Sequence, residues 1–223
     1  MVQAARTYRF LARALEIYPY QPLYGVDSRA FGHKKAAVRA CLDRWDAFKP
    51  HLPRSGSALD IGCQNGFFTL MMAEHGLATI GVEREGAALR VCQILALANK
   101  PLPAAFLPME ISDETVEKLP RADVVLCLSI FHNWARDLGF DRADRIMRVI
   151  AARTGSVMIF ETGQSDQTDV AWAQRLAFMG DDPRAWISDY LVDLGFTSVK
   201  QIGAFAGTTK HYSTRYLFVA RKD

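Results

Sequence analysis

The sequence predicts an α/β fold in which helices cover both faces of a largely parallel sheet. From Ser57 onward, short apolar runs of strand length alternate with segments of helical periodicity. Strands separated by helices pair in parallel, because each helix carries the chain back across one face of the sheet. The chain is also long and apolar enough to bury one sizeable core, since 50% of its 223 residues are hydrophobic.

A helical extension is expected before the sheet, so we divide the chain into an extension over residues 1–54 and an α/β domain over residues 55–223. Each of two expected helices in the extension carries apolar side chains on one face. These faces consist of Tyr8, Leu11, Leu15 and Tyr18 in the first helix, and of Val38, Leu42, Trp45 and Phe48 in the second. The second helix should end before Pro50.

In the α/β domain, the first expected strand runs from Ser57 into the acidic residue Asp60. The later strands are expected at Leu77–Glu83, Ala104–Pro108, Ala122–Leu128, Ser156–Glu161, Phe196–Ile202 and Thr214–Ala220. Beyond the helix that follows the first strand, helices are expected at Ala87–Ala98, Asp141–Ala152, Thr168–Phe178 and Pro183–Leu194. A long loop over Gly203–Ser213 should join the last two strands.

The turn after the first strand is the most informative segment. Gly62 and Gly66 are four residues apart, and Asp60 precedes them. Such a turn exposes backbone N–H groups at a helix N-terminus and admits a ligand where side chains would block it. A dinucleotide fingerprint needs a further glycine at the position of Gln64, so that the backbone can approach a pyrophosphate. The NAD-binding interpretation therefore fails, which leaves a different ligand or an ordinary strand–turn–helix.

Glu83 ends the second apolar run, roughly 20 residues beyond the glycine turn. An open α/β sheet places a carboxylate here for ribose, because one carboxylate can accept hydrogen bonds from two vicinal hydroxyls. A solvated acid at the start of a helix is the alternative. The glycine turn upstream favours ribose binding.

Composition and residue spacing limit the classes of protein to which the chain could belong. The net charge of +3 neither requires nor excludes nucleic-acid binding. The four cysteines are widely spaced and form no C-x-x-C pair, which indicates reduced thiols in a cytoplasmic protein. The five histidines show no metal-binding spacing, so we expect no metal. No apolar run approaches the ~20 residues of a membrane span, and residues 1–20 lack the apolar stretch of a secretory signal.

The glycine turn and Glu83 together resemble the class I S-adenosylmethionine (SAM)-dependent methyltransferases, from Ser57 to the C-terminus. The resemblance implies a Rossmann-like, seven-stranded sheet whose last strand is antiparallel, SAM as cofactor, and a substrate cap formed by the N-terminal extension. In that family an acid after the third strand binds adenine; Glu110 matches that position, although Asp113 could compete. The implied cofactor-binding residues are Asp60, Gly62, Cys63, Gly66, Phe67, Glu83, Glu110, Ile111, Leu128 and Ser129.

The run Leu-Ser-Ile-Phe-His-Asn over residues 128–133 indicates one subgroup of these methyltransferases. It resembles the Leu-Ser-Val-Phe-His-His signature of a subgroup that includes bacterial polysaccharide chain-terminating methyltransferases, although Asn133 replaces the second histidine. The paired Phe67-Phe68 after the glycine turn and the acidic end of the fifth strand at Glu161 agree with it. The tRNA wobble-uridine carboxymethyltransferases and the methylphosphate capping enzymes of small RNAs share parts of this pattern.

The resemblance places the segment after the fourth strand beside the transferable methyl group, which makes His132 the catalytic candidate. As a base it would serve an alcohol acceptor, and as a hydrogen-bond donor it would serve an anionic one; a histidine in a turn is the plain alternative. The substrate-binding candidates are Tyr24, Asn133, Trp134, Glu161, Tyr212 and Arg215. We expect O-methylation of a saccharide or of a phosphorylated or acidic small molecule. An RNA-modifying methyltransferase and a SAM-binding regulatory or scaffolding protein are the alternatives.

Overall fold

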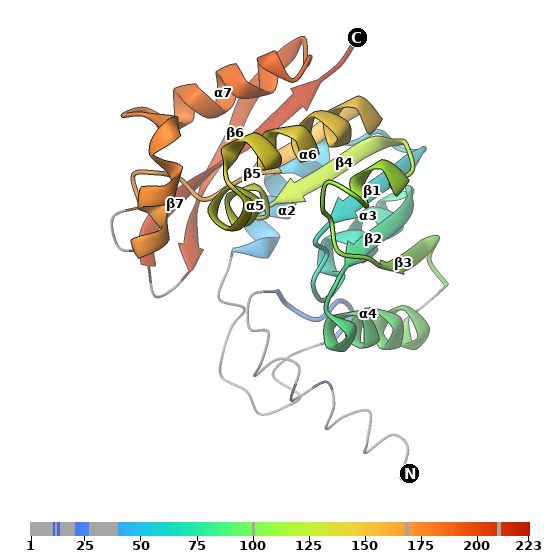
Figure 1. The fold of residues 1–223 in the computed structure, drawn as a ribbon. Helices are drawn as coiled ribbons and strands as arrows, with labels where there is room; N and C mark the ends of the chain where they lie inside the picture. The colour runs from blue at the N-terminus through green and yellow to red at the C-terminus, as the bar shows by residue number, and fades with distance from the viewer. Residues whose placement is uncertain are drawn as a thin grey trace.

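The computed structural model describes Leu11, Arg13 and residues 21–26, 40–99, 101–167, 170–208 and 211–223. The first predicted helix, apart from Leu11, lies outside these residues. The described residues form a seven-stranded sheet with strand order β3-β2-β1-β4-β5-β7-β6 (Figure 1). The strands are β1 Ser57–Ile61, β2 Ala78–Glu83, β3 Ala104–Pro108, β4 Ala122–Leu128, β5 Thr154–Glu161, β6 Ser198–Thr208 and β7 His211–Arg221. The predicted fold class is confirmed.

Strands β3, β2, β1, β4 and β5 are parallel, and β7 is antiparallel to both of its neighbours. Neighbouring β1 and β4 are the point where the strand order reverses, because the chain proceeds from β1 toward β3 and from β4 toward β6. The connections leave this point on opposite sides, which opens a crevice at the carboxyl ends of the strands. Residues that follow β1, β2 and β4 therefore meet there.

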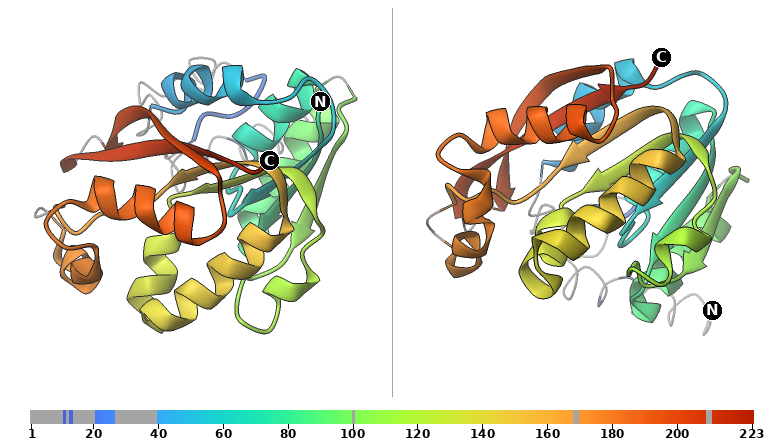
Figure 2. Two further views of the ribbon diagram at one scale, coloured as in Figure 1. Left: turned by 90° about the horizontal axis from the view of Figure 1, so that it is seen from above. Right: turned by 45° about the horizontal axis from the view of Figure 1, so that its top comes forward.

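Helices cover both faces of the sheet (Figure 2). The α-helices are α2 Cys41–Phe48, α3 Phe67–His75, α4 Gly86–Ala98, α5 Phe131–Leu138, α6 Phe140–Arg153 and α7 Pro183–Asp193. Short 3₁₀ helices are η2 Lys49–His51, η3 Val116–Lys118 and η4 Ala171–Met179. Side chains of α2, α3 and α4 pack in one apolar cluster, and those of α5, α6 and α7 in the other. In the described part of the chain, no helix combines the length and the apolarity needed to span a membrane.

Aromatic contacts hold α2 on the sheet. Phe48 is fully buried, and its ring centroid lies 5.2 Å from that of Trp45 and 5.5 Å from that of Phe68 on α3. The helix ends before Pro50, as predicted, but its expected apolar face was wrong at Leu42, whose side chain is 60% exposed. The buried face instead consists of Cys41, Arg44, Trp45 and Phe48. A charged side chain takes the place that an apolar one was expected to fill.

The loop predicted over Gly203–Ser213 is also wrong, because β6 and β7 continue as a hairpin as far as the pair Thr208 and His211. Irregularities in register between Gln201 and Gly203, and again before Thr208, let the glycine- and alanine-rich segment stay paired. This hairpin extends beyond the end of β5, whose pairing with β7 stops at Glu161 and Leu217.

Two helices differ from the prediction. The segment predicted as a helix over Thr168–Phe178 is the 3₁₀ helix η4, whose backbone leaves helical geometry at Leu176 (φ −102°, ψ 17°). Helix α5 was not predicted, and it contains His132, which the plain alternative had placed in a turn. Its apolar side chains at Phe131, Trp134 and Ala135 have helical spacing, and this was the signal that could have revealed it.

The packing of α2 predicts a large difference between two substitutions on the same helix. Phe48→Ala should lower the free energy of unfolding by about 3–5 kcal/mol, because it leaves a cavity between α2, Trp45 and Phe68. Leu42→Ala removes a mostly exposed side chain and should change it by less than about 0.5 kcal/mol. Urea denaturation of both variants measures the difference. Equal losses would mean that α2 does not pack on the sheet through this face.

Candidate cofactor and acceptor site

Two neighbouring cavities lie at the carboxyl ends of the strands. Their volumes are about 270 Å³ and about 290 Å³. Both are lined by the same central residues, Gly62, Glu83, Arg84, Ile130 and Asn133. These residues follow β1, β2 and β4, so the pair of cavities lies at the topological switch point of the sheet, where open α/β sheets bind their ligands.

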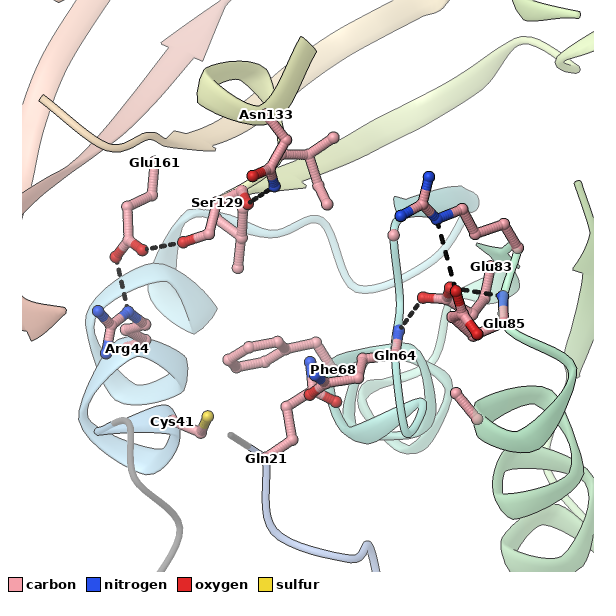
Figure 3. A pocket seen from close by; sticks show the side chains of 15 residues that line it. Gln21, Cys41, Arg44, Gln64, Phe68, Glu83, Glu85, Ser129, Asn133 and Glu161 are labelled. Carbon is pink, nitrogen blue, oxygen red and sulfur yellow. Dashed lines mark hydrogen bonds and ion pairs between the residues drawn. The ribbon is translucent and has the colours of Figure 1, made fainter. Parts of the chain in front are cut away.

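The first cavity extends toward α2 and β5. Its other lining residues are Gln21, Cys41, Arg44, Gln64, Phe68, Glu85, Ala88, Leu128, Ser129 and Glu161 (Figure 3). The second cavity extends toward β3 and the end of α5. Its other lining residues are Ile61, Val82, Met109, Glu110, Ile111, Ser112, Trp134, Arg136, Asp137 and Leu138.

The glycine turn is held in a conformation that suits glycine. The N–H groups of Gly62 and Cys63 both donate to the carbonyl of Val82, at 2.8 and 3.0 Å. Gly62 has φ +69° and Gly66 has φ +75°, a region that L side chains rarely adopt. A Cβ atom on Gly62 would collide with the side chain of Ile130, which lies between the two cavities. Glycine at this position therefore lets Ile130 pack against the turn where both cavities meet.

Glu83 fixes this turn from the end of β2. One carboxylate oxygen accepts the N–H of Gln64 at 2.9 Å, and the other accepts the N–H of Glu85 at 2.9 Å. Gln64 itself has a left-handed backbone (φ +51°), and its carbonyl accepts a hydrogen bond from the thiol of Cys92. The carboxylate predicted to bind ribose thus also shapes the loop next to it. Each carboxylate oxygen keeps a second lone pair for a ligand.

Asp60 lies behind the turn, and it lines neither cavity among the described residues. Its carboxylate accepts a hydrogen bond from the Thr69 hydroxyl at 2.7 Å, and its side chain is buried. Burial raises the pKa of Asp60 to about 6, and the nearby Glu83 adds to the rise, while the Thr69 hydrogen bond opposes it. Asp60 supports the turn from within the core.

The two phenylalanines that follow the turn have different positions. Phe68 lines the first cavity, whereas Phe67, the predicted cofactor-binding residue, packs in the core. The Phe67 N–H at the start of α3 donates to the side-chain carbonyl of Gln21, at 3.4 Å. The thiol of Cys63 is buried beside Cys92, and both the neighbouring thiol and burial raise its pKa. Cys63 lines neither cavity, and its backbone N–H is engaged by the Val82 carbonyl.

Ser129 and Glu161 form the wall of the first cavity between β4 and β5. The Ser129 hydroxyl donates to Glu161 Oε1 at 2.7 Å, and its N–H donates to the Glu161 carbonyl at 2.7 Å. Arg215 Nη1 donates to the Ser129 hydroxyl at 2.9 Å, and Arg44 Nε donates to Glu161 Oε2 at 2.6 Å. All four side chains are at most 6% exposed. Figure 3 shows Glu161 between Arg44 and Ser129.

The backbone of Ser129 is strained, with φ +61°. Ser129 and Gln64 are the two residues other than glycine with a positive φ in the described part of the chain, and both line the first cavity. Such conformations cost on the order of 1–3 kcal/mol and occur mainly at functional sites. The strain marks the first cavity as the functional one.

His132 is not among the lining residues of either cavity, and its ring packs against η4. Its ring stacks on Trp172 with a centroid distance of 4.9 Å, and it is 5% exposed. The Gly163 N–H donates to His132 Nδ1 at 3.0 Å, and the His132 N–H donates to Thr162 Oγ1 at 3.1 Å. Because Nδ1 accepts a backbone N–H, the proton of the neutral imidazole is on Nε2. His132 can donate a hydrogen bond from Nε2, but in this arrangement it cannot accept a proton there.

The other predicted acceptor-side residues are dispersed. Asn133 lies between the two cavities and donates from Nδ2 to the Ser129 carbonyl at 3.3 Å. Trp134 lines the second cavity, beside Glu110 and Ile111. Tyr24 is buried in the core, where burial and Glu74 raise its pKa to about 12. Tyr212 is in β7, but its side chain lies outside the described residues.

Sequence reasoning missed several lining residues of the first cavity. Arg84 forms an ion pair with Glu110 across the mouth of the second cavity, with 2.9 Å between Nη1 and Oε1. Arg44 comes from a different part of the chain. A charge in the middle of the Cys41–Phe48 apolar stripe was the available signal for it, because such a residue is rarely buried unless it is paired.

Residues 59–151 match the family model described as a methyltransferase domain. This stretch therefore carries a methyltransferase domain of the class I SAM-dependent type. The O-antigen chain terminator bifunctional methyltransferase/kinase WbdD of Escherichia coli is 30% identical over 141 residues, which are 58% of this chain and 20% of the relative. The tRNA U34 carboxymethyltransferase of Azotobacter vinelandii is 34% identical over 94 residues, which are 40% of this chain and 28% of the relative.

Solved structures agree with this assignment. A crystal structure of WbdD superimposes with a TM-score of 0.74 at 25% identity, and covers 94% of this chain and 46% of that one. Magnesium protoporphyrin IX methyltransferase from Synechocystis PCC 6803 with bound SAM superimposes with a TM-score of 0.60 at 17% identity, over 97% of each chain, which shows the shared fold. The present chain spans about a fifth of the length of the WbdD relative.

SAM is the cofactor of this family, and the site fits it. Gly62 and Glu83 line both cavities, and the Glu83 carboxylate, which was expected to bind ribose, keeps lone pairs for a ligand. Glu110 and Ile111, the residues expected to contact adenine, line the second cavity. The position of Gln64 agrees with a ligand that has no pyrophosphate.

We expect Glu83→Ala to weaken SAM binding about tenfold to a hundredfold, because it removes charge-assisted hydrogen bonds worth roughly 1.5–3 kcal/mol. Calorimetric titration with SAM measures this, and Glu114→Ala, at an exposed acid outside both cavities, is the control. Wild-type protein should bind NAD poorly in the same assay. Unchanged SAM affinity together with a lower melting temperature would assign Glu83 to the support of the turn alone.

The raised pKa of Asp60 predicts that the stability difference between wild type and an uncharged Asp60 variant changes with pH. An acid whose pKa rises on folding, here from 3.8 to about 6, stabilises the fold when protonated and loses that contribution as pH rises through this range. Asp60→Asn keeps an oxygen for the Thr69 hydroxyl but carries no charge. Its stability relative to wild type should therefore increase between pH 4 and pH 7. Denaturant unfolding at both pH values measures it, and a difference that stays constant would contradict the assignment.

Proposed function

We propose that this chain transfers a methyl group from SAM to an oxygen atom of a saccharide or of a phosphorylated or acidic small molecule, and that it does so in the cytoplasm. SAM supplies an electrophilic methyl group on a sulfonium. The contribution of the protein is to hold the acceptor in line with that group and to exclude water. The first cavity is the candidate acceptor site, because Ser129, Glu161 and Phe68 surround it.

The hydrogen bond from the Gly163 N–H to His132 Nδ1 is the observation that carries the choice of acceptor. With its proton on Nε2, His132 acts as a donor, so an alcohol acceptor would lack this side chain as a base. A phosphate or carboxylate is already deprotonated at neutral pH and needs donors instead. Among the proposed acceptors, a phosphorylated or acidic small molecule is therefore favoured over a neutral saccharide.

The arginines of the cavity wall support the same choice. A guanidinium has five N–H donors. Arg44 donates from one nitrogen each to Glu161, to the Ala40 carbonyl and to the Ala206 carbonyl. Arg215 approaches from β7 through Ser129. Buried guanidinium groups next to a cavity suit an oxyanion, which they can bind with two parallel hydrogen bonds.

Two alternatives remain in the test. An RNA acceptor is suggested by the similarity to a tRNA U34 carboxymethyltransferase, which covers 40% of this chain. The saccharide acceptor of the proposal itself is supported by the similarity to an O-antigen chain terminator, which covers 58% of this chain. The other alternative is a regulatory protein that only binds SAM. Such a protein would not need the strained backbone of Ser129 in the wall of the first cavity.

A panel of acceptors tests the proposal. Purified protein is incubated with methyl-labelled SAM and with sugar phosphates, uronic acids, the matching neutral sugars or unmodified tRNA. We expect label in a sugar phosphate or uronic acid and none in the matching neutral sugars. Transfer only to tRNA would support the RNA alternative, and SAM binding without transfer to any acceptor would contradict an enzymatic role.

The role of His132 makes a separate prediction. His132→Ala should lower turnover by about 10²–10³-fold, the usual cost of losing one positioned hydrogen-bond donor, while SAM affinity stays within a few-fold. His132→Gln, which can donate a hydrogen bond but cannot take a proton, should recover most of the activity. Steady-state kinetics with the acceptor from the panel measure both variants. A failure of glutamine to restore activity would show that the imidazole moves a proton, and normal turnover in the alanine variant would show that it is structural.

A further inference from the structure

Arg44 connects the N-terminal part of the chain to the acceptor wall. It is 117 residues away from Glu161 in sequence, and the distance from its Nε to Glu161 Oε2 is 2.6 Å. Both side chains are almost completely buried, at 2% and 0% exposed. The guanidinium also donates to the Ala206 carbonyl of β6 at 3.2 Å and lies 5.1 Å from the centroid of the Phe205 ring. A single side chain of α2 thus contacts β5 and β6 at the edge of the first cavity.

The hydrogen bonds of this wall run in one direction. An arginine can only donate, so the Ser129 hydroxyl accepts from Arg215 and must direct its own proton to Glu161. Glu161 receives this proton on Oε1 and the Arg44 Nε–H on Oε2. Such a chain needs Glu161 as a carboxylate. Burial alone would favour the protonated form, and an adjacent cation favours the charged one.

We propose that Arg44 is a positioning residue for methyl transfer: it keeps Glu161 ionised and thereby holds the Ser129 hydroxyl, so that helix α2 completes the acceptor wall. The inference rests on the proposed function in that Ser129 and Glu161 face the acceptor. It goes beyond that function because the N-terminal segment becomes part of the reaction site rather than a cover over it.

Other charged groups around Glu161 do not replace Arg44. Arg215 from β7 reaches Ser129, and its contact with Glu161 runs through that hydroxyl. His132 from α5 directs Nδ1 to the Gly163 N–H. Across the cavity are Glu83, Arg84 and Glu85, of which Glu83 is engaged with backbone N–H groups. The direct ion pair of Glu161 among the described residues is therefore the one with Arg44.

Four variants test the proposal by thermal unfolding between pH 6 and pH 9: Arg44→Met, Arg44→Lys, Glu161→Gln, and Arg44→Met combined with Glu161→Gln. Arg44→Met should lower the melting temperature by on the order of 10 °C, because it leaves a buried carboxyl without its cation. The loss should grow as pH rises, since the protonated form of Glu161 is tolerated and the charged form is not. Adding Glu161→Gln to Arg44→Met should restore part of the loss and remove its pH dependence. Arg44→Lys, which keeps the charge, should follow the wild-type pH dependence.

Methyl transfer by the same variants tests positioning, with whichever acceptor of the panel is labelled, RNA included. Per folded molecule, Arg44→Met should show a turnover that falls toward pH 6, where wild type and Arg44→Lys do not fall, and Glu161→Gln should be slow at every pH. SAM affinity measured by calorimetry should stay within a few-fold in all variants. The opposite pH trends of stability and turnover in Arg44→Met are the signature of a positioning role.

Two results would overturn the proposal. One is an Arg44→Met melting temperature that Glu161→Gln does not raise, which would make Arg44 a packing residue. The other is a turnover profile of Arg44→Met that superimposes on that of wild type. If no acceptor in the panel is labelled, the proposed function fails, while the unfolding series still decides whether Arg44 controls the ionisation of Glu161.

Discussion

The adjacency of β1 and β4 is the constraint on which the site depends. Their following segments leave the sheet in opposite directions, so no connection crosses the carboxyl ends of these two strands. The residues that meet there come from three separate turns: Gly62 after β1, Glu83 at the end of β2, and Ser129 after β4. Each turn needs support from outside its own segment, because two of them contain backbone conformations that L side chains rarely adopt.

Carboxylates provide most of that support. Asp60 receives a hydroxyl behind the first turn, and Glu83 receives one N–H group from that turn and one from Glu85 in the turn after β2. Glu161 receives a hydroxyl and a guanidinium at the turn after β4. A hydrogen bond to a charged acceptor is roughly twice as strong as a neutral one, which suits turns that must remain strained without a ligand. Two of these carboxylates also line cavities, so support of the backbone and contact with a ligand are combined in one group.

The sheet, most of its helices and the second cavity could be predicted from sequence because their signals are local. Strand-length apolar runs, Asp182 as an N-cap whose side chain accepts the Ala185 N–H, and an acid at Glu83 each depend on a few neighbouring residues. The two strands of the β6–β7 hairpin were expected, but its extension beyond Gly203 could not be predicted, since this pairing depends on bulges that the glycine- and alanine-rich sequence allows without indicating them.

Arg44 and Phe68 escaped prediction for a different reason. Which of two adjacent phenylalanines faces a cavity is decided by packing against Phe48, a residue of α2 that is 20 positions upstream. Arg44 is buried because Glu161 is present, and neither residue alone indicates the other. A periodicity argument instead assigned Leu42 to the core, where hydrophobicity would place it.

The buried pair also explains why α2 cannot be regarded as a separate cover. Replacing a buried ion pair with apolar residues is often neutral or stabilising, so stability alone gives no reason to keep one. An apolar pair at positions 44 and 161 would pack the helix equally well, but it would leave the Ser129 hydroxyl without its acceptor. The charged pair is therefore best explained by what it does at the cavity. On this argument the folding of α2 onto the sheet and the completion of the acceptor wall are one event, since the same guanidinium takes part in both.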